Sequence, residues 1–313
     1  MSFSEKKSPP SPKYLTMNRI LRAPWHDYTR RCIYMVTLNK SPQAERFGSL
    51  EGDPRLPVGR IGSPFVSASS IGSAIKATLR RFYTIEPAVR ILQYALMPDH
   101  LHLLLFVEYP TEATLGQIIA RFKVEVNKEA GITPVFAKGF NDQILKNSRP
   151  LDTLYNYLRE NPRRLAVRKA YPEYFRRVNA LKIGENTYQA YGNFQLLDNP
   201  FREQVVIHRA DTPETRKHNR ELWLYTSSNG GVLVSPFISA AEKEIRAEAE
   251  ASGGNIILIT NEPFPERYKP SGRDFDLCEA GRLLIISANL PASLTRSTCL
   301  AMNTLASRLT THY

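Results

Sequence analysis

The stretch RILQYALMPDHLHLLLFV at residues 90–107 contains two apolar runs separated by MPD at residues 97–99. Proline and aspartate favour a turn, so this stretch predicts two strands joined as a hairpin. Alternate side chains of a strand point to the same face, which places His100 beside His102 on the second strand. Two neighbouring imidazoles can bind one metal ion. A pair of strand histidines without a ligand is the commoner case for so short a pattern, so the pair alone does not establish a metal site.

The sequence on both sides of this hairpin predicts one domain in which strands and helices alternate. The predicted elements are a strand at Cys32–Leu38, a helix at Gly72–Tyr83, strands at Arg90–Leu96 and Leu101–Val107, a helix at Leu115–Ala130, a strand at Gly139–Leu145 and a helix at Leu151–Lys169. This order, β-α-β-β-α-β with an extra helix, is that of a ferredoxin-like plait. The stretch from Asn39 to about Ser70 is rich in Pro, Gly and Ser, which predicts an excursion or a flap.

The pattern changes at residues 191–202, which resemble a linker. Apolar strands and helices then alternate to the end, which predicts a smaller Rossmann-like α/β domain with a parallel sheet. No G-x-G-x-x-G or Walker pattern occurs in it, so no bound nucleotide cofactor is predicted. A scaffold, a dimer contact and a partner-docking surface remain open as its role. The predicted domains are a disordered tail at 1–18, a first domain at 19–190, the linker, and a second domain at 203–313.

Positive charge is concentrated in the first part of the chain, which has a net charge of +12 overall. Residues 1–190 contain 29 Lys and Arg against 16 Asp and Glu, whereas residues 191–313 contain 13 against 14. A one-sided positive balance favours a phosphate-backbone partner, because each neutralised phosphate releases condensed counterions. A solvated basic face that serves solubility is the alternative explanation.

Neither a membrane nor an oxidising compartment is indicated. No apolar run reaches the roughly 18 residues that cross a bilayer, and no segment near Met1 is typical of a signal peptide. The three cysteines, Cys32, Cys278 and Cys299, have no paired spacing. They predict buried thiols in a reducing cytoplasm and neither a disulfide framework nor a zinc site.

A second informative segment is LYNYLRENPRR at residues 154–164. Tyr157 and Asn161 are four residues apart and are neighbours on one helical face, where a phenol and an amide oxygen can supply a nucleophile and a metal ligand. Pro162 disfavours helical geometry at the residue before it, so either the helix kinks or Asn161 caps a second helix. A core aromatic is the alternative for Tyr157. Tyr155 is roughly 200° around the helix and is predicted to face elsewhere.

Together these motifs resemble the REP-associated tyrosine transposases, which are single-tyrosine HUH nucleases, named for two histidines that flank one hydrophobic residue. MPDHLHLLL, then GFNDQIL, then a tyrosine four residues before Asn-Pro occur in the order that this family shows, and WHDY at residues 25–28 resembles its opening. The resemblance covers roughly residues 20–175. The chain departs from the family at Gln143, where a histidine is expected, and in the long insertion before Gly72, which leaves the choice of substrate open.

The resemblance implies that His100 and His102 are metal ligands, that Tyr157 is the nucleophile and that Asn161 is the third ligand. The metal is expected to be Mg²⁺ or Mn²⁺, because histidine tolerates Mn²⁺ and an amide oxygen suits Mg²⁺. Attack by Tyr157 on single-stranded or hairpin DNA gives a 5′-phosphotyrosyl link and frees a 3′-hydroxyl, and an incoming 3′-hydroxyl can reverse the step. The chain is expected to be a cytoplasmic, nucleoid-associated bacterial transposase, and a monomer or a homodimer.

Basic residues around and beyond Tyr157 are candidates for a DNA groove. They are Arg159, Arg163, Arg164, Arg168, Lys169, Arg176 and Arg177, with Tyr171, Tyr174 and Phe175 among them. Interleaved cations and aromatics suit a groove that follows a backbone and stacks bases, and a solvated basic helix face is the alternative. Two further functions fit the same motifs. One is a nickase that does not join strands, such as a replication initiator or a domesticated host nuclease. The other is a single-stranded DNA-binding protein with an inert metal site.

Overall fold

The computed structural model describes residues 23–145 and 151–310 and divides into two compact units, Met1–Arg164 and Leu165–Tyr313. The predicted tail at residues 1–18 lies outside the described residues. The boundary falls inside the helix α3 (Leu151–Ala170), earlier in the chain than the predicted linker. Residues 1–164 carry 24 Lys and Arg against 14 Asp and Glu, and residues 165–313 carry 18 against 16. The basic excess therefore belongs mainly to the first unit.

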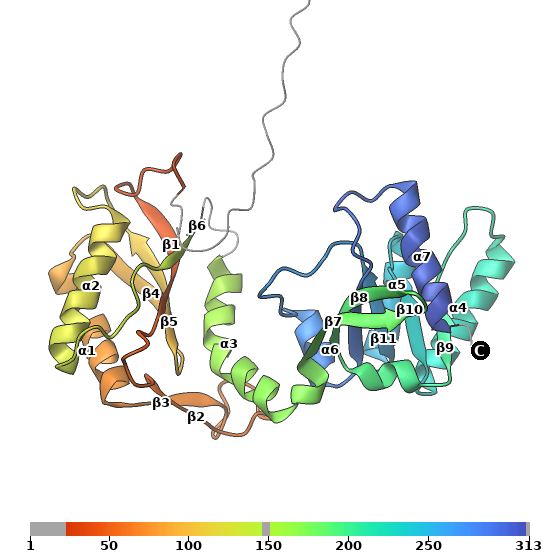
Figure 1. Ribbon diagram of the computed structural model, residues 1–313, viewed down its shortest axis with the longest axis horizontal. Helices are drawn as coiled ribbons and strands as arrows, with labels where there is room; N and C mark the ends of the chain where they lie inside the picture. Colours follow the sequence, from red (N-terminus) through yellow and green to blue (C-terminus); the bar gives the residue numbers. More distant parts are fainter. Residues whose placement is uncertain (1–22, 146–150, 311–313) are drawn as a thin grey trace, which may run out of the picture. The chain divides into compact units, whose positions relative to one another are not determined.

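The first unit is built on a four-stranded antiparallel sheet with the strand order β4-β5-β1-β6. Its elements are β1 (Cys32–Asn39), β2 (Gly48–Glu51), β3 (Phe65–Ala68), α1 (Ser70–Ile85), β4 (Val89–Leu96), β5 (His100–Val107), α2 (Leu115–Ala130), β6 (Asn141–Leu145) and the first part of α3. The strands and helices predicted from Cys32 to Leu145 are confirmed with small shifts at their ends. α1 and α2 cover one face of the sheet (Figure 1).

The sheet has an apolar face and a more polar face because side chains alternate along its central strands. Leu101, Leu103 and Leu105 of β5 are fully buried in one core with side chains of α1 and α2. His100 and His102 alternate with these leucines and therefore lie on the opposite face. The packing of the leucines thus directs both histidines away from the core of the first unit.

The stretch predicted as an excursion contains a small sheet of its own, in which β2 and β3 pair antiparallel along their whole length. We call residues 48–68 the arm. The residue before it, Phe47, donates its backbone N–H to the carbonyl of Pro98 (2.9 Å) and accepts from the N–H of Ser69 (3.0 Å). The base of the arm is therefore tied to the turn that joins β4 to β5.

Gly72, near the start of α1, lies against the base of the arm and leaves no room for a side chain. A Cβ at this position would clash with the backbone carbonyl of Phe47, whereas a Cβ at Gly116 in α2 would meet no atom nearer than 3.7 Å. Gly72→Ala is expected to destabilise the protein by about 1–3 kcal/mol through overpacking. Gly116→Ala, the matched control, is expected to be neutral or to stabilise by at most about 1 kcal/mol. Urea unfolding checks the pair, and equal midpoints for the two variants would argue against this packing.

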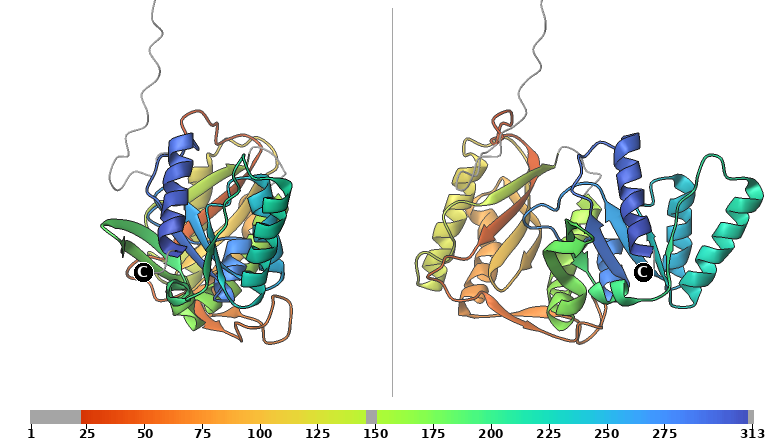
Figure 2. Two further views of the ribbon diagram at one scale, coloured as in Figure 1. Left: turned by 90° about the vertical axis from the view of Figure 1, so that its right-hand side faces the viewer. Right: turned by 45° about the vertical axis from the view of Figure 1, so that its right-hand side comes forward.

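The second unit is built on a six-stranded mixed sheet with the order β7-β8-β12-β11-β10-β9. After α3 its elements are η1 (Pro172–Phe175), β7 (Arg176–Ile183), β8 (Asn186–Gly192), η2 (Phe194–Asp198), β9 (Arg202–Gln204), α4 (Pro213–Ser228), β10 (Val232–Ser235), α5 (Ala240–Ala251), β11 (Asn255–Thr260), α6 (Arg273–Glu279), β12 (Leu283–Ser287) and α7 (Arg296–Thr310). β9 to β12 run parallel, and β8 pairs antiparallel with β12 and β7. α4, α5 and α6 pack on one face of this sheet and α7 packs on the other (Figure 2).

Two parts of the second unit differ from the expectation. Residues 176–192 form the β7–β8 hairpin and extend the sheet of the second unit, whereas the sequence predicts a first domain that continues to residue 190. The side chains of β7 are exposed or half-buried, so no apolar alternation marks it as a strand. The first strand after the predicted linker, β9, begins at the last residue of that linker and has only three residues.

Other features of the chain concern its environment. None of the helices in the described part of the chain combines the length and apolar character that crossing a bilayer requires. The three cysteines are free thiols, and Cys278 is buried, whereas Cys32 and Cys299 are half-buried.

Candidate active site

His100 and His102 lie side by side on β5, on the face of the sheet opposite to α1 and α2. Their Nε2 atoms are 3.2 Å apart, and their ring centroids are 4.6 Å apart with an interplanar angle of 80°. Two nitrogens that bind one cation at about 2.0–2.1 Å with an angle of about 90–110° are about 2.9–3.4 Å apart. The separation of the two Nε2 atoms falls in that range, so the pair fits a shared cation.

Each of these histidines makes a further hydrogen bond through its other ring nitrogen. His100 Nδ1 lies 2.6 Å from Oδ1 of Asp99, and His102 Nδ1 lies 2.8 Å from Oγ1 of Thr37, its partner in the β1–β5 register. An ionised carboxylate only accepts, so His100 donates from Nδ1, and in a neutral imidazole this leaves a lone pair at Nε2. When Thr37 Oγ1 likewise accepts from Nδ1 of His102, the Nε2 atoms of both rings carry lone pairs that face each other. A cation between the two nitrogens stabilises this arrangement.

The environment of His102 keeps it in the form that binds metals. Burial lowers the pKa of His102 to about 3, and the neighbouring His100 contributes to the same shift. A histidine with so low a pKa is neutral near pH 7, and neutral imidazole is the form that acts as a metal ligand.

The helix α3 brings Tyr157 to the histidine pair. The centroid of the Tyr157 ring lies 6.2 Å from that of His102, with an angle of 60° between the rings. Tyr157 is half-buried, whereas the side chain of Tyr155 is exposed. The helical period therefore separates the two tyrosines as predicted, and Tyr157 is the one that meets the histidines.

Asn161 lies one helical turn after Tyr157 and is 5% exposed. α3 continues through Pro162, so Asn161 lies inside the helix and does not cap a second one. Its amide nitrogen is buried and has no hydrogen-bond partner among the described residues. A buried amide without a partner is costly unless a ligand satisfies it, and rotation of the amide exchanges its oxygen and nitrogen. Asn161 therefore stays a predicted ligand, one helical turn from Tyr157 and with a buried amide that the described residues leave unpaired.

The candidate ligand set is small and mixed. Within residues 23–145 and 151–310, no group of three or more His, Cys, Asp and Glu side chains gathers in a way that could hold a metal ion. The set predicted from the sequence consists of two imidazoles and one amide, which would leave the other positions around a cation to water or to substrate oxygens.

Arg164, predicted as a DNA-binding residue, contacts the proposed nucleophile. Its guanidinium carbon lies 5.8 Å from the centroid of the Tyr157 ring, and its Nε lies 3.5 Å from a carboxylate oxygen of Glu160. The side chain of Arg164 is only 12% exposed. A cation held in this place favours negative charge on a phosphate that approaches the phenol.

The other predicted DNA-binding residues are divided between the two units. Arg159 is exposed on α3, and Arg163 donates from Nε to the backbone carbonyl of Leu56 (3.1 Å). The remaining four, Arg168, Lys169, Arg176 and Arg177, belong to the second unit. There Arg177 donates to two backbone carbonyls of residues 265–266, and Arg168 and Arg176 lie over the rings of Phe275 and Phe194.

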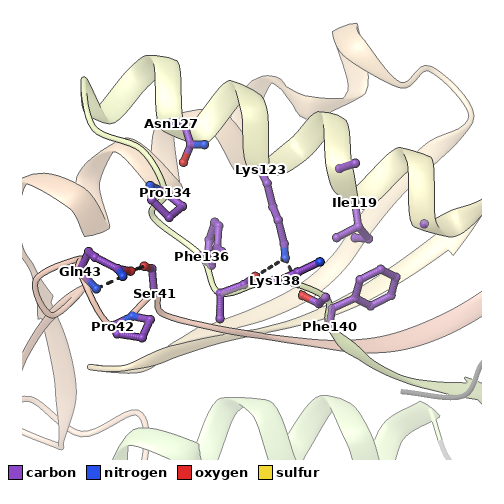
Figure 3. A pocket seen from close by; sticks show the side chains of 14 residues that line it. Ser41, Pro42, Gln43, Ile119, Lys123, Asn127, Pro134, Phe136, Lys138 and Phe140 are labelled. Carbon is purple, nitrogen blue, oxygen red and sulfur yellow. Dashed lines mark hydrogen bonds between the residues drawn. The ribbon is translucent and has the colours of Figure 1, made fainter. Parts of the chain in front are cut away.

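A cavity of about 560 Å³ in the first unit is separate from this site. It lies between α2 and the loops that follow β1 and precede β6 (Figure 3). Lys123 lies in its wall and donates to two backbone carbonyls, so this cation is already bound by the protein. Neither the histidine pair nor Tyr157 lines the cavity.

Comparisons with known proteins give weak similarities. No family model matches the chain. An uncharacterized protein of Haemophilus influenzae is 23% identical over 128 residues, which cover 33% of this chain and 71% of that protein. A REP-associated tyrosine transposase bound to a REP hairpin has a TM-score of 0.33 and 10% identity, over 45% of this chain and 73% of its own. DNA processing protein A of Helicobacter pylori, which binds single-stranded DNA, has a TM-score of 0.31 and 19% identity, over 44% and 67%.

Proposed function

We propose that this chain is a metal-dependent single-stranded DNA endonuclease and strand transferase of the single-tyrosine HUH class, related to the REP-associated tyrosine transposases. The observation that carries the proposal is the meeting of side chains from two distant segments. The Nε2 atoms of His100 and His102 are 3.2 Å apart, and the ring of Tyr157 lies 6.2 Å from that of His102. An imidazole pair that fits a cation, next to a phenol, suits phosphoryl transfer to tyrosine.

The architecture of each unit supports this proposal. The order β4-β5-β1-β6, with α1 and α2 on one face, supports a ferredoxin-like plait as the fold of the first unit. The parallel strands β9 to β12, with helices on both faces, favour a Rossmann-like second domain. The basic excess of residues 1–164 favours a nucleic-acid partner for the unit that contains Tyr157.

In the proposed reaction, Tyr157 Oη attacks the scissile phosphorus, and the bond from phosphorus to the 3′-oxygen breaks. The phenolic proton passes in net to that leaving oxygen, so the products are a 5′-phosphotyrosyl link and a free 3′-hydroxyl. The 3′-hydroxyl of a second strand can then attack the link, release Tyr157 and join the strands.

His100, His102 and Asn161 are the residues that would hold Mg²⁺ or Mn²⁺. When bound, such a cation polarises the scissile phosphate and neutralises part of its charge. The hydrogen bonds that the imidazoles make to Asp99 and Thr37 orient the two rings toward that position.

A test uses the full chain, pools of single-stranded and hairpin oligonucleotides, and a denaturing gel. With Mn²⁺ and a 3′ label on the DNA, we expect a labelled protein band that resists detergent, and chelation with EDTA should remove it. A 5′ label should not stay with the protein, because the 5′ fragment leaves with the 3′-hydroxyl. An added strand with a free 3′-hydroxyl should yield a joined product, which a nickase would not form. Failure of every pool to give an adduct would overturn the proposal.

Arg164→Ala is expected to slow adduct formation at saturating DNA by about 100-fold, because a preorganised cation beside the reacting groups is lost. Arg159→Ala, which removes an exposed cation from the same helix, is the matched control. It is expected to weaken DNA binding and to lower the slope of log affinity against log salt concentration by about one, the value for one phosphate contact. The rate at saturating DNA should change little. Single-turnover rates and binding titrations separate the two effects. A normal saturated rate for Arg164→Ala would remove Arg164 from the site.

A further inference from the structure

The arm connects the two halves of the proposed active site. Its base is bonded to the β4–β5 turn, since the N–H of Phe47 donates to the carbonyl of Pro98 (2.9 Å). Pro98 lies two residues before His100. Its tip reaches α3, where Arg163 Nε donates to the carbonyl of Leu56 (3.1 Å), less than two turns after Tyr157. The segment that comprises Phe47 and the arm therefore contacts both the turn before the histidine strand and the helix with the tyrosine.

The loop at the tip holds the Leu56 carbonyl in a defined place. The N–H of Asp53 donates to the carbonyl of Gly62 (2.9 Å), which closes the loop, and the N–H of Leu56 donates to the carbonyl of Asp53 (3.1 Å). The Asp53 carboxylate accepts from the backbone N–H and the guanidinium of Arg55. Gly62 has φ +85°, a conformation that glycine adopts without strain. A closed loop thus presents the acceptor to Arg163.

We propose that the arm is a brace for the helix that carries Tyr157, and that Arg163 is a positioning residue that acts through this helix. The inference rests on the proposed function, because it concerns the same site. Arg163 is half-buried and its Nε donates to a backbone carbonyl, in contrast to the exposed Arg159. In-line attack needs close alignment of the phenol with the phosphate, and a displacement of about 1 Å can cost roughly 100-fold in rate.

Four variants test the brace. Arg163→Ala removes the donor, and replacement of residues 54–61 by two glycines removes the acceptor while keeping β2 and β3. Arg163→Lys retains a donor and is expected to recover part of the lost rate. Arg159→Ala removes an exposed cation from the same helix and is the control. The measurements are the adduct rate at saturating DNA, the affinity and salt dependence for a fluorescein-labelled oligothymidylate, and amide hydrogen exchange around Tyr157.

For Arg163→Ala and for the arm replacement, we expect the saturated rate to fall roughly 10- to 100-fold and amide exchange near Tyr157 to accelerate. Affinity for oligothymidylate and its salt dependence should stay within about twofold of wild type, since no phosphate contact is lost. The opposite result for Arg163→Ala would be a slope of log affinity against log salt that is lower by about one, with a normal saturated rate and normal amide exchange near Tyr157. That result would show that Arg163 binds phosphate and would overturn the brace.

The outcome for the brace is separable from the outcome for the proposed function. When the wild-type chain forms no adduct at all, the proposed function fails, and amide exchange still decides the brace. The brace is overturned, whatever the adduct assay gives, when amide hydrogen exchange near Tyr157 is the same in Arg163→Ala as in wild type.

Discussion

Tyr157→Phe is expected to abolish the covalent protein–DNA adduct, with a loss of at least about 1,000-fold in its rate of formation. Phenylalanine keeps the ring beside His102 and Arg164 but has no hydroxyl with which to attack phosphorus. Binding of single-stranded DNA should be unchanged within about twofold, because no cation is removed. Quantification of the detergent-resistant, 3′-labelled protein band measures the effect.

Tyr155→Phe is the matched control for this prediction. Tyr155 lies on the same helix two residues earlier, and its side chain is exposed. Its adduct yield should equal that of wild type. Adduct formation by Tyr157→Phe at a rate near that of wild type would assign the nucleophile to another residue.

The second large effect is expected for His102→Ala. Loss of one imidazole leaves His100 without its partner at 3.2 Å. Mutation of a residue that only hydrogen-bonds to a metal ligand already lowers metal affinity about 10- to 100-fold. Loss of a ligand itself should therefore lower the Mn²⁺ affinity at least about 100-fold. Adduct formation at limiting Mn²⁺ should fall by at least the same factor, since charge on the phosphate is no longer neutralised. Electron paramagnetic resonance of free Mn²⁺ reports the affinity.

His218→Ala serves as the control for the histidine variant. His218 is exposed on α4, and its loss should leave both the Mn²⁺ affinity and the adduct rate unchanged. Wild-type Mn²⁺ binding by His102→Ala would show that any cation needed for cleavage is bound elsewhere.

Much of the first unit follows from sequence because its signals are local. The two apolar runs of residues 90–107 and the turn between them determine β4 and β5, and strand alternation places His100 and His102 on one face. Thr114 and Gln117 form a capping box at the start of α2, and Gly131 ends the helix with φ +67°, so both limits of α2 are encoded locally.

The supporting contacts of the site depend on tertiary structure and have no local signal. Thr37 meets His102 through the β1–β5 register, and Leu56 meets Arg163 across more than a hundred residues. In the sequence, both Arg159 and Arg163 are basic residues on a helix, and both predict a DNA contact. Only the structure shows that Arg159 is exposed and that Arg163 is bonded to a backbone carbonyl. Asp99 is the exception, because it directly precedes His100 and a carboxylate next to a metal-binding histidine is a usual outer-shell partner.

The limits of the two units also depend on long-range pairing. Residues 176–192 join the second sheet only because β8 pairs with β12, which lies about ninety residues further along the chain. Composition changes later, near residue 191, and therefore indicates a boundary that differs from the one set by contacts.

The most direct test of the account is the identification of the residue that carries DNA after cleavage. Protein from the Mn²⁺ reaction is digested with nuclease and trypsin, and the peptide that ends at Arg159, which contains both Tyr155 and Tyr157, is fragmented in a mass spectrometer. We expect a 5′-phosphonucleotide on Tyr157, and we expect it to disappear in His102→Ala at limiting Mn²⁺. A nucleotide on Tyr155 or on a residue outside this peptide would show that Tyr157 is not the nucleophile.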